Sequence, residues 1–351
     1  MVGDRIRIGV LGGGMISQIA HLPFYLKDSR CEVVAIAESR PSLVEALSAE
    51  LGGGRLLYNH ADLLARPDID AIVISAPRPA TGPLTLMALE AGKHVLAEKP
   101  MAHSIEQAGR LVSAAAAKSL IYAVGYMKRY DPGVQTGKRL FESVMSDGRL
   151  GRLLYARFYD YSNAYAAPPP PHVRPKDSRP LRFPVWPLYP EWLPERYRDA
   201  YAWFLNAGSH DVNLLRYFFP REIDVRDAHW SEDTLAATLQ AGACLVSLEV
   251  VKAAAGVWLE GAEFVFERGR ITLTIPSPMA VDRVTEVRLD DAGRGLSGAP
   301  QPAGTGWSFA RQAEGFVDAL TGAAKPLTDG AEGLADMILT ESIWRKVAAA
   351  R

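Results

Sequence analysis

The stretch Arg5–Ser17 reads R-I-R-I-G-V-L-G-G-G-M-I-S. It begins with a short run rich in β-forming apolar residues, passes through three consecutive glycines, and continues with apolar residues at helical spacing. Strand, glycine turn and helix are the context in which a G-x-G-x-x-G pattern indicates dinucleotide binding. Gly12 allows the tight turn, Gly14 lets a pyrophosphate approach the backbone, and Ser17 in the third position is small enough for helix–strand packing. Taken alone, the pattern also fits an ordinary glycine turn.

A second apolar strand, Cys31–Ala37, ends at the acid Glu38, roughly twenty residues beyond the glycines. An acid at that spacing is expected to bind the hydroxyls of an adenosine ribose, and its charge opposes the extra phosphate of NADP. Ser39 and Arg40 follow at once, and such a pair can hold a 2′-phosphate. The charge argument favours NAD over NADP, and both cofactors stay open.

Strands continue to alternate with helices through residue 124. Apolar runs predict strands over 69–76 and 120–124, and apolar spacing predicts helices over 83–91 and 105–117. This alternation predicts a doubly wound parallel sheet with right-handed crossovers, a Rossmann arrangement.

The segment 94–102, H-V-L-A-E-K-P-M-A, is a short apolar run that meets an acid, a base and a proline. A buried strand of a parallel sheet would deliver these charged groups at its carboxyl end, where open parallel sheets bind ligands. Lys99 can there hydrogen-bond a substrate hydroxyl or carbonyl, and Pro100 restricts the backbone that aims it. The plainer interpretation is a strand-to-loop junction with a surface ion pair, since charged residues are mostly exposed.

The whole chain sets further bounds. Its 351 residues favour two domains, and 48% apolar with 23% charged residues is typical of a globular protein. A formal net charge of −1 argues against nucleic acid as a partner, and no apolar run reaches the roughly 18 residues of a membrane span. The two distant cysteines form neither a disulfide framework nor a zinc spacing. Because a strand begins so near Met1, we expect no signal peptide and a reducing, cytoplasmic setting.

The second half has a different pattern. Helices are predicted over 132–145 and, at the end of the chain, over 308–320 and 330–346. A strand is predicted over 152–162. The strands of a mostly antiparallel sheet are predicted over 223–230, 234–240, 243–251, 256–266 and 270–275. A proline-rich insert, 164–198, carries Arg174, Lys176, Arg179 and Arg182 ahead of Trp186, Tyr189 and Trp192. Long loops are often binding loops or lids, and arginines with aromatics suit a sugar or phosphate. A structural arm that covers the sheet or a neighbouring subunit is the alternative.

The segment 202–219 is predicted to be one helix. Asn206 and His210 are four residues apart and would then share a face, so that Asn206 could orient the imidazole. A histidine suits general acid–base work because its reference pKa is near neutral. A lone helical histidine is, however, more often structural. We find no metal-ligand spacing, because His60, His94 and His103 stand apart.

Taken together, the glycine turn, the acid after the second strand, and the runs A-L-E-A-G-K-H-V-L-A-E-K-P-M-A and G-Y-M-K-R-Y-D-P resemble the Gfo/Idh/MocA oxidoreductase family. The likeness spans most of residues 5–351 apart from the insert. It implies a Rossmann domain over 1–124 and, over 125–351, a substrate-binding and oligomerisation domain with a large open sheet. Two positions depart from the family pattern: Thr81 stands where histidine is frequent, and Asn206 where many members carry aspartate.

The resemblance also implies a function: NAD(P)-dependent interconversion of a secondary alcohol and a ketone on a sugar, sugar nucleotide or cyclitol, in a homodimer or homotetramer that binds neither membrane nor nucleic acid. Its catalytic residues would be Lys99, His210 and Asn206. The cofactor would contact Gly12, Gly14, Met15, Ile16, Glu38, Ser39, Arg40, Ala76, Pro77, Glu98 and Lys99, and the substrate Lys99, Tyr126, Arg129, Asn206 and His210. The alternative is a non-catalytic, cofactor-binding sensor of the same fold, in which Thr81 and Asn206 mark lost chemistry.

Overall fold

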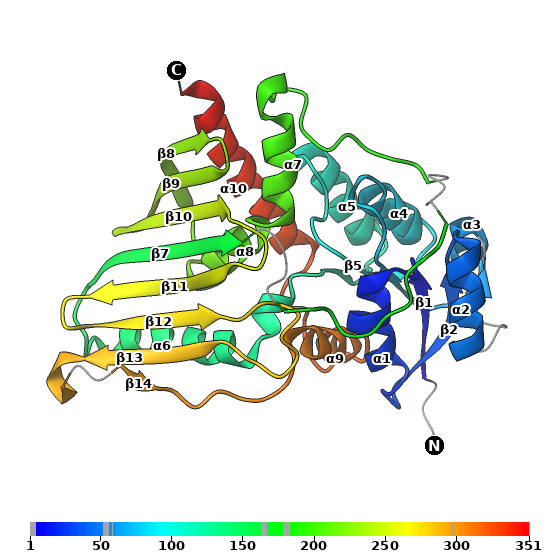
Figure 1. Ribbon diagram of the computed structural model, residues 1–351, viewed down its shortest axis with the longest axis horizontal. Coiled ribbons are helices and arrows are strands. Elements are labelled where there is room, and N and C mark those ends of the chain that lie inside the picture. Colours follow the sequence, from blue (N-terminus) through cyan, green and yellow to red (C-terminus); the bar gives the residue numbers. More distant parts are fainter. Residues whose placement is uncertain are drawn as a thin grey trace. The chain divides into compact units, whose positions relative to one another are not determined.

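The computed structural model describes residues 5–51, 56–57, 59–162, 167–177, 183–295 and 298–350 (Figure 1). The chain forms two compact units. The first comprises residues 1–126, 170–190 and 309–334, and the second comprises 127–169, 191–308 and 335–351. Two segments beyond residue 124, one from the proline-rich insert and one near the end of the chain, therefore pack with the first unit.

The first unit is built on a six-stranded sheet in the order β3-β2-β1-β4-β5-β6, and every pairing in it is parallel. Its strands are β1 (Ile6–Leu11), β2 (Cys31–Ala37), β3 (Leu56–Leu57), β4 (Ala71–Ile74), β5 (His94–Ala97) and β6 (Tyr122–Val124). β4 is A-I-V-I with all four residues buried, as expected for a strand covered on both faces. The predicted doubly wound parallel sheet is confirmed.

Helices cover both faces of this sheet. Ile8 and Val10 of β1 pack in one core cluster with Leu22 and Phe316, while a Cβ on Gly9, which points the opposite way, would meet Leu63. The helical segments are η1 (Ser17–His21), α1 (Leu22–Tyr25), α2 (Pro41–Leu51), α3 (His60–Leu64), α4 (Arg78–Glu90), α5 (Ile105–Ala117) and α9 (Ser308–Leu320). The alternation of side chains along a strand explains why a single apolar run serves both layers.

Helix α4 begins at Arg78, five residues earlier than the sequence predicts. Pro83 therefore lies inside the helix, although a proline there removes a backbone hydrogen bond to the carbonyl four residues back. That carbonyl belongs to Pro79, and it accepts the backbone N–H of Trp186 at 2.8 Å instead. A contact from a distant part of the chain thus satisfies the group that Pro83 leaves without its helical partner.

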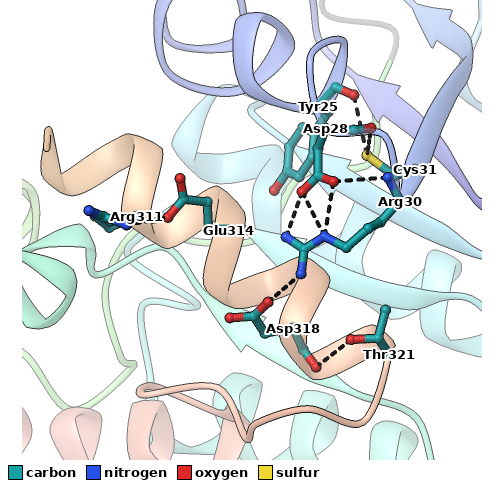
Figure 2. Close-up of polar contacts among 8 residues, drawn as sticks. All are labelled: Tyr25, Asp28, Arg30, Cys31, Arg311, Glu314, Asp318 and Thr321. Carbon is teal, nitrogen blue, oxygen red and sulfur yellow. Dashed lines mark hydrogen bonds and ion pairs between the residues drawn. The ribbon is translucent and has the colours of Figure 1, made fainter.

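Helix α9 joins the first unit from far along the chain. Figure 2 shows Arg30, the residue before β2, between Asp28 and Asp318. Its guanidinium lies 2.5 Å from the Asp318 carboxylate and 2.6 Å from that of Asp28. Beside it, the Cys31 thiol donates to the Tyr25 carbonyl at 3.2 Å, and burial raises the pKa of that thiol to about 11. Cys31 is therefore an inert packing residue.

The second unit is built on an eight-stranded sheet in the order β14-β13-β12-β11-β7-β10-β9-β8. β7 (Leu153–Ser162) and β10 (Cys244–Lys252) pair in parallel and every other pairing is antiparallel. The remaining strands are β8 (Ile223–Ser231), β9 (Thr234–Ala241), β11 (Trp258–Phe266), β12 (Gly269–Ile275), β13 (Glu286–Asp291) and β14 (Ala299–Pro300). The predicted large, mostly antiparallel sheet is confirmed, and β13 and β14 add to it.

Helices and aromatic side chains form the core of this unit. Phe141, from α6 (Pro132–Asp147), contacts the rings of Phe218 and Phe264 at centroid distances of 5.7 and 4.7 Å. Trp344, from α10 (Gly330–Ala349), is fully buried among aromatic rings that include Tyr201. The other helical segments are η3 (Met127–Tyr130), η4 (Glu195–Tyr197), α7 (Arg198–Asn206), α8 (Ser209–Phe218) and η5 (Ala292–Arg294). Across the described residues, no helix is long and apolar enough to cross a membrane.

Candidate active site

The glycine turn after β1 has the geometry that its sequence predicts. Gly12 has φ +97°, and a Cβ there would lie 2.2 Å from the Ser75 carbonyl oxygen, so only glycine fits. Ser17 is fully buried and its hydroxyl donates to the Gly12 carbonyl, which closes the turn from the other side. The helix that starts at Met15 leaves its first backbone N–H groups, from Gly14 to Ile16, at the carboxyl end of β1. This is a ready-made pyrophosphate cradle.

Glu38 directly follows β2, beside this turn. Its carboxylate accepts the backbone N–H groups of Gly13, Ser39 and Arg40 at 2.8 to 2.9 Å, and the Arg40 guanidinium binds both of its oxygens at 2.9 and 2.6 Å. Burial alone would raise the pKa of Glu38, but the bonds from Arg40 and Gly13 outweigh it and lower that pKa. The corner that would hold the adenosine ribose is therefore a buried, neutral ion pair, in which Arg40 offsets the charge expected to exclude a 2′-phosphate.

The next two strands end beside the glycine turn. Ala76 and Pro77 follow β4, and the Thr81 hydroxyl lies 3.4 Å from the carbonyl oxygens of both, so Thr81 serves the start of its own helix. Glu98 follows β5 and its carboxylate lies 2.9 Å from Nε2 of His21. Lys99 comes next and is half-buried. Each of these residues thus lies at the carboxyl edge of the parallel sheet, as the sequence predicts.

Two further residues at this edge were not singled out from the sequence. His21 is 1% exposed and holds Glu98, and Arg78 is half-buried at the first position of α4, with its pKa lowered by burial. Burial, and then the nearby Arg78 charge, lower the pKa of His103 to about 4, so His103 is neutral at pH 7. Arg78 follows Pro77 directly, and its place after a buried strand is the signal that could have identified it.

The helix predicted over 202–219 is in fact two helices. α7 ends at Asn206, α8 begins at Ser209, and the His210 N–H bonds to the Ala207 carbonyl rather than to that of Asn206. The expectation that Asn206 and His210 share one helix face is therefore wrong. The break occurs at Gly208, where a Cβ would lie 2.5 Å from the Phe204 ring and 3.0 Å from Val250, so close packing requires a glycine there. His210 is buried in the first turn of α8, whereas Asn206 is exposed.

Tyr126 and Arg129, expected to contact substrate, are both buried. The Arg129 guanidinium donates to the Asn213 carbonyl at 2.8 Å and lies over the Tyr217 ring, 5.1 Å from its centroid. These contacts tie η3 to α8 and give Arg129 a structural role, while its contact with substrate stays a prediction. Lys99 and His210 belong to different units, so their meeting at one reacting oxygen also stays a prediction.

The second unit holds a buried cluster that the sequence did not reveal: Asp160, Asp211, Glu260 and Lys128. Asp160 and Glu260 are direct partners across β7 and β11, and carboxylate oxygens of the three acids lie within 4.8 Å of one another. The Lys128 ammonium pairs with Glu260, whereas neither Asp211 oxygen has a hydrogen-bond partner. All four residues are at most 5% exposed. Asp160 shares its strand face with Ala156 and Phe158, which was the available signal.

The charge of this cluster must be reduced, because three buried carboxylates face one ammonium. Burial, then the neighbouring carboxylates, raise the pKa of Asp211 far above its usual range, and burial raises that of Glu260 to about 8. Burial alone would lower the pKa of Lys128, but the surrounding acids raise it, so its ammonium stays charged. Asp211 and Glu260 therefore hold protons at pH 7. Asp211 directly follows His210 in the chain.

Residues 6–126 match the model of an oxidoreductase family, GFO_IDH_MocA, described as an NAD-binding Rossmann fold. An uncharacterised oxidoreductase of Schizosaccharomyces pombe is 34% identical over 42% of this chain and 40% of its own length. Inositol 2-dehydrogenase 3 of Saccharopolyspora erythraea is 32% identical over 62% of this chain and 55% of its own length. These two matches therefore span about half of each relative. Inositol 2-dehydrogenase of Rubrobacter xylanophilus is 28% identical over 97% of this chain and 90% of the relative.

Solved structures share the fold over nearly the whole chain. KijD10, a 3-ketoreductase from Actinomadura kijaniata in complex with NADP and TDP-benzene, has a TM-score of 0.76 at 20% identity and covers 98% of both chains. Apo scyllo-inositol dehydrogenase from Lactobacillus casei has a TM-score of 0.71 at 20% identity, and the match covers 99% of this chain and 97% of the dehydrogenase chain. Over its Rossmann unit, residues 6–126, the chain therefore matches the Gfo/Idh/MocA oxidoreductase family, and its similarity to the inositol 2-dehydrogenases extends beyond that unit.

Proposed function

We propose that this protein is an NAD(P)-dependent oxidoreductase that interconverts a secondary alcohol and a ketone on a sugar, sugar nucleotide or cyclitol. The observation that carries the proposal is the carboxyl edge of the first sheet. There the Glu38–Arg40 pair, the Gly12 turn and the Lys99 segment follow strands β2, β1 and β5 of one sheet, in which β4 separates β1 from β5. A cofactor bound along such an edge has its phosphates at the glycine turn. Its nicotinamide accepts or gives the hydride when bound.

The roles of the side chains follow from their chemistry. The Lys99 ammonium hydrogen-bonds the reacting oxygen and stabilises its developing negative charge. His210 takes the proton of that oxygen during oxidation and returns it during reduction. Asn206, at the end of a separate helix, can bind substrate or the imidazole but cannot stabilise an imidazolium by charge, as an aspartate would. We therefore expect ketone reduction to be the favoured direction.

The substrate class is inferred from the relatives. Inositol dehydrogenases and a 1,5-anhydro-D-fructose reductase occur among the matches, and these names refer to cyclic polyols or sugars. A 3-ketoreductase in complex with NADP and TDP-benzene also occurs among them. We propose a ligand of that kind for this chain, with residues 1–124 binding the cofactor and 125–351 binding substrate. We further propose that the protein is cytoplasmic and that it forms a homo-oligomer. The reason for the homo-oligomer is that open sheets like that of the second unit leave one face available to a second subunit.

Substitution of the two proposed catalytic residues tests the function. Lys99→Ala and His210→Ala should keep NAD(P) affinity within about threefold and lose turnover by at least about a hundredfold, the usual scale for proton-transfer groups. Matched controls are Lys325→Ala and His229→Ala, which remove an exposed lysine and an exposed histidine and should leave turnover unchanged. Cofactor binding is measured by nicotinamide fluorescence and turnover with a panel of cyclitols and keto-sugars.

Each result has a distinct meaning. A wild-type protein that binds neither NADH nor NADPH would refute the oxidoreductase assignment. Full activity in Lys99→Ala would refute the role of that residue alone. Cofactor binding without turnover on any polyol or keto-sugar would instead favour a non-catalytic sensor of the same fold.

A further inference from the structure

The described parts of the proline-rich insert lie against the first unit, and their contacts share one location. Val173 exchanges two hydrogen bonds with the Gln18 side chain, donating at 2.8 Å and accepting at 3.1 Å. The same Gln18 amide donates to the Gly13 carbonyl at 2.9 Å. The backbone at Val173 is thus joined to the glycine turn through a single side chain. We call residues 172–177 and 183–187 the strap.

The strap also contacts the helix that follows β2. The Lys176 N–H donates to the Ser42 hydroxyl at 2.9 Å, and Ser42 bonds to the Asp177 carboxylate through its hydroxyl and its N–H. Ser42 is the second residue of α2, two residues beyond Arg40. The segment between Val173 and Asp177 therefore extends from the glycine turn to the Glu38–Arg40 corner. In this fold the pyrophosphate and the adenosine ribose occupy those two places.

The second half of the strap contacts the next three helices. The Phe183 ring lies 5.4 Å from that of His60, the first residue of α3, and the Trp186 N–H donates to the Pro79 carbonyl in α4. Arg110 stacks over the Trp186 ring at 5.0 Å, and the Gln107 side chain, in the first turn of α5, donates to the Pro187 carbonyl at 3.1 Å. A Cβ on Gly82 would lie 2.5 Å from Trp186, so the indole is packed closely onto α4.

The strap thus contacts the helical segment that follows each of the strands β1 to β5. Each contact lies near the start of that helical segment. Helices of a parallel sheet begin at the carboxyl edge, which is also where the dinucleotide binds. A segment that served only to cover apolar surface would have no reason to follow this edge from helix start to helix start. In Figure 1 the two parts of the strap belong to the extended green segments drawn beside the helices of the first unit.

From this placement we propose that the strap is part of the cofactor site, and that it covers the bound NAD(P) so that the cofactor leaves slowly. This proposal rests on the proposed function, because it requires a dinucleotide at that edge. Release of the cofactor then requires the strap contacts to open first. Each hydrogen bond lost from the strap should therefore speed release more than it slows hydride transfer.

The test compares the release rate of NADH or NADPH in variants that loosen the strap. Asp177→Ala removes the carboxylate that binds Ser42, and Trp186→Ala removes the indole that packs on Gly82. Asp224→Ala is the control, because it removes one exposed carboxylate from the second unit and matches the charge change. Release of the reduced cofactor is followed by the loss of its fluorescence after addition of excess oxidised, non-fluorescent cofactor. Hydride transfer is measured in a single turnover.

We expect release to be about tenfold faster in Asp177→Ala and in Trp186→Ala, with unchanged release in Asp224→Ala and single-turnover rates within twofold of the wild type. Equal release rates in all four proteins would overturn the proposal, while leaving the oxidoreductase assignment intact. A wild type that binds no dinucleotide would instead be a failure of the proposed function.

A second measurement uses the unaltered protein and does not depend on the folding of variants. Trypsin can cut after Lys176, whose side chain is exposed. Saturating NADH or NADPH should slow that cut at least about fivefold, measured by mass spectrometry against cleavage after the exposed Arg294. An unchanged rate at Lys176 under saturating cofactor would contradict the proposal.

Discussion

Glu260→Gln is the most informative single substitution in the buried cluster. Glu260 is fully buried, is opposite Asp160 across two paired strands, and has a pKa raised to about 8, chiefly by burial. In the unfolded chain its pKa returns to about 4.5. Between these two values the native state holds a proton that the unfolded state has released. Glutamine has nearly the same shape and holds no titratable proton.

Proton linkage gives the sign and the size of the expected change in the free energy of unfolding with pH. The stabilisation from the raised pKa is fully present below about pH 4.5 and is progressively lost as the pH rises to about 8, because in that window only the unfolded state has released its proton. Above about pH 8 both states are deprotonated and the loss stops. Within this window one extra proton in the native state lowers the free energy of unfolding by about 1.4 kcal/mol for each pH unit. The wild type should therefore lose up to about 3 kcal/mol relative to Glu260→Gln between pH 5.5 and 7.5.

Urea unfolding at pH 5.5, 6.5 and 7.5, followed by near-ultraviolet circular dichroism, measures this difference. Glu263→Gln, three residues along the same strand and only half-buried, is the matched control and should follow the wild type at every pH. Lys128→Met should destabilise by about 3–5 kcal/mol, because it leaves the buried carboxylates without a cation. A difference between wild type and Glu260→Gln that does not change with pH would refute the inference that Glu260 holds a proton.

Three further predictions concern the framework. Gly133→Ala should destabilise the second unit by more than about 2 kcal/mol, because its Cβ would lie 1.9 Å from the Thr285 carbonyl oxygen; an unchanged urea midpoint would contradict this. Trp344→Ala should cost about 3–5 kcal/mol in the same assay, since the fully buried indole packs among aromatic rings. Arg40→Ala should weaken NADP binding at least about tenfold relative to NAD, because Glu38 would then face the 2′-phosphate without its guanidinium; calorimetric titration with both cofactors decides, and an unchanged ratio would argue against that role.

Local features of the sequence determined most of the first unit. The strands are short apolar runs buried on both faces, and a tight turn with φ +97° at Gly12 admits only glycine. Helix α5 has the bounds that its apolar spacing predicts, and in the structure the Ser104 side chain accepts the Gln107 N–H and caps its start. Lys99 lies at a sheet edge because β5 ends two residues before it. In each case the sequence signal lies within a few residues of the feature that it predicts.

Tertiary structure decided the rest. The register of β7 and β11 places Asp160 opposite Glu260, a hundred positions apart, and no local pattern specifies that register. Close packing of Gly208 on Phe204 and Val250 breaks a segment that its helical spacing predicts to be continuous. The insert was recognised as irregular, but its path along five helix starts depends on groups such as the Pro79 carbonyl, which another part of the chain leaves available. Charge, burial and hydrogen bonding at these places depend on which distant segments meet, and a linear pattern does not contain that information.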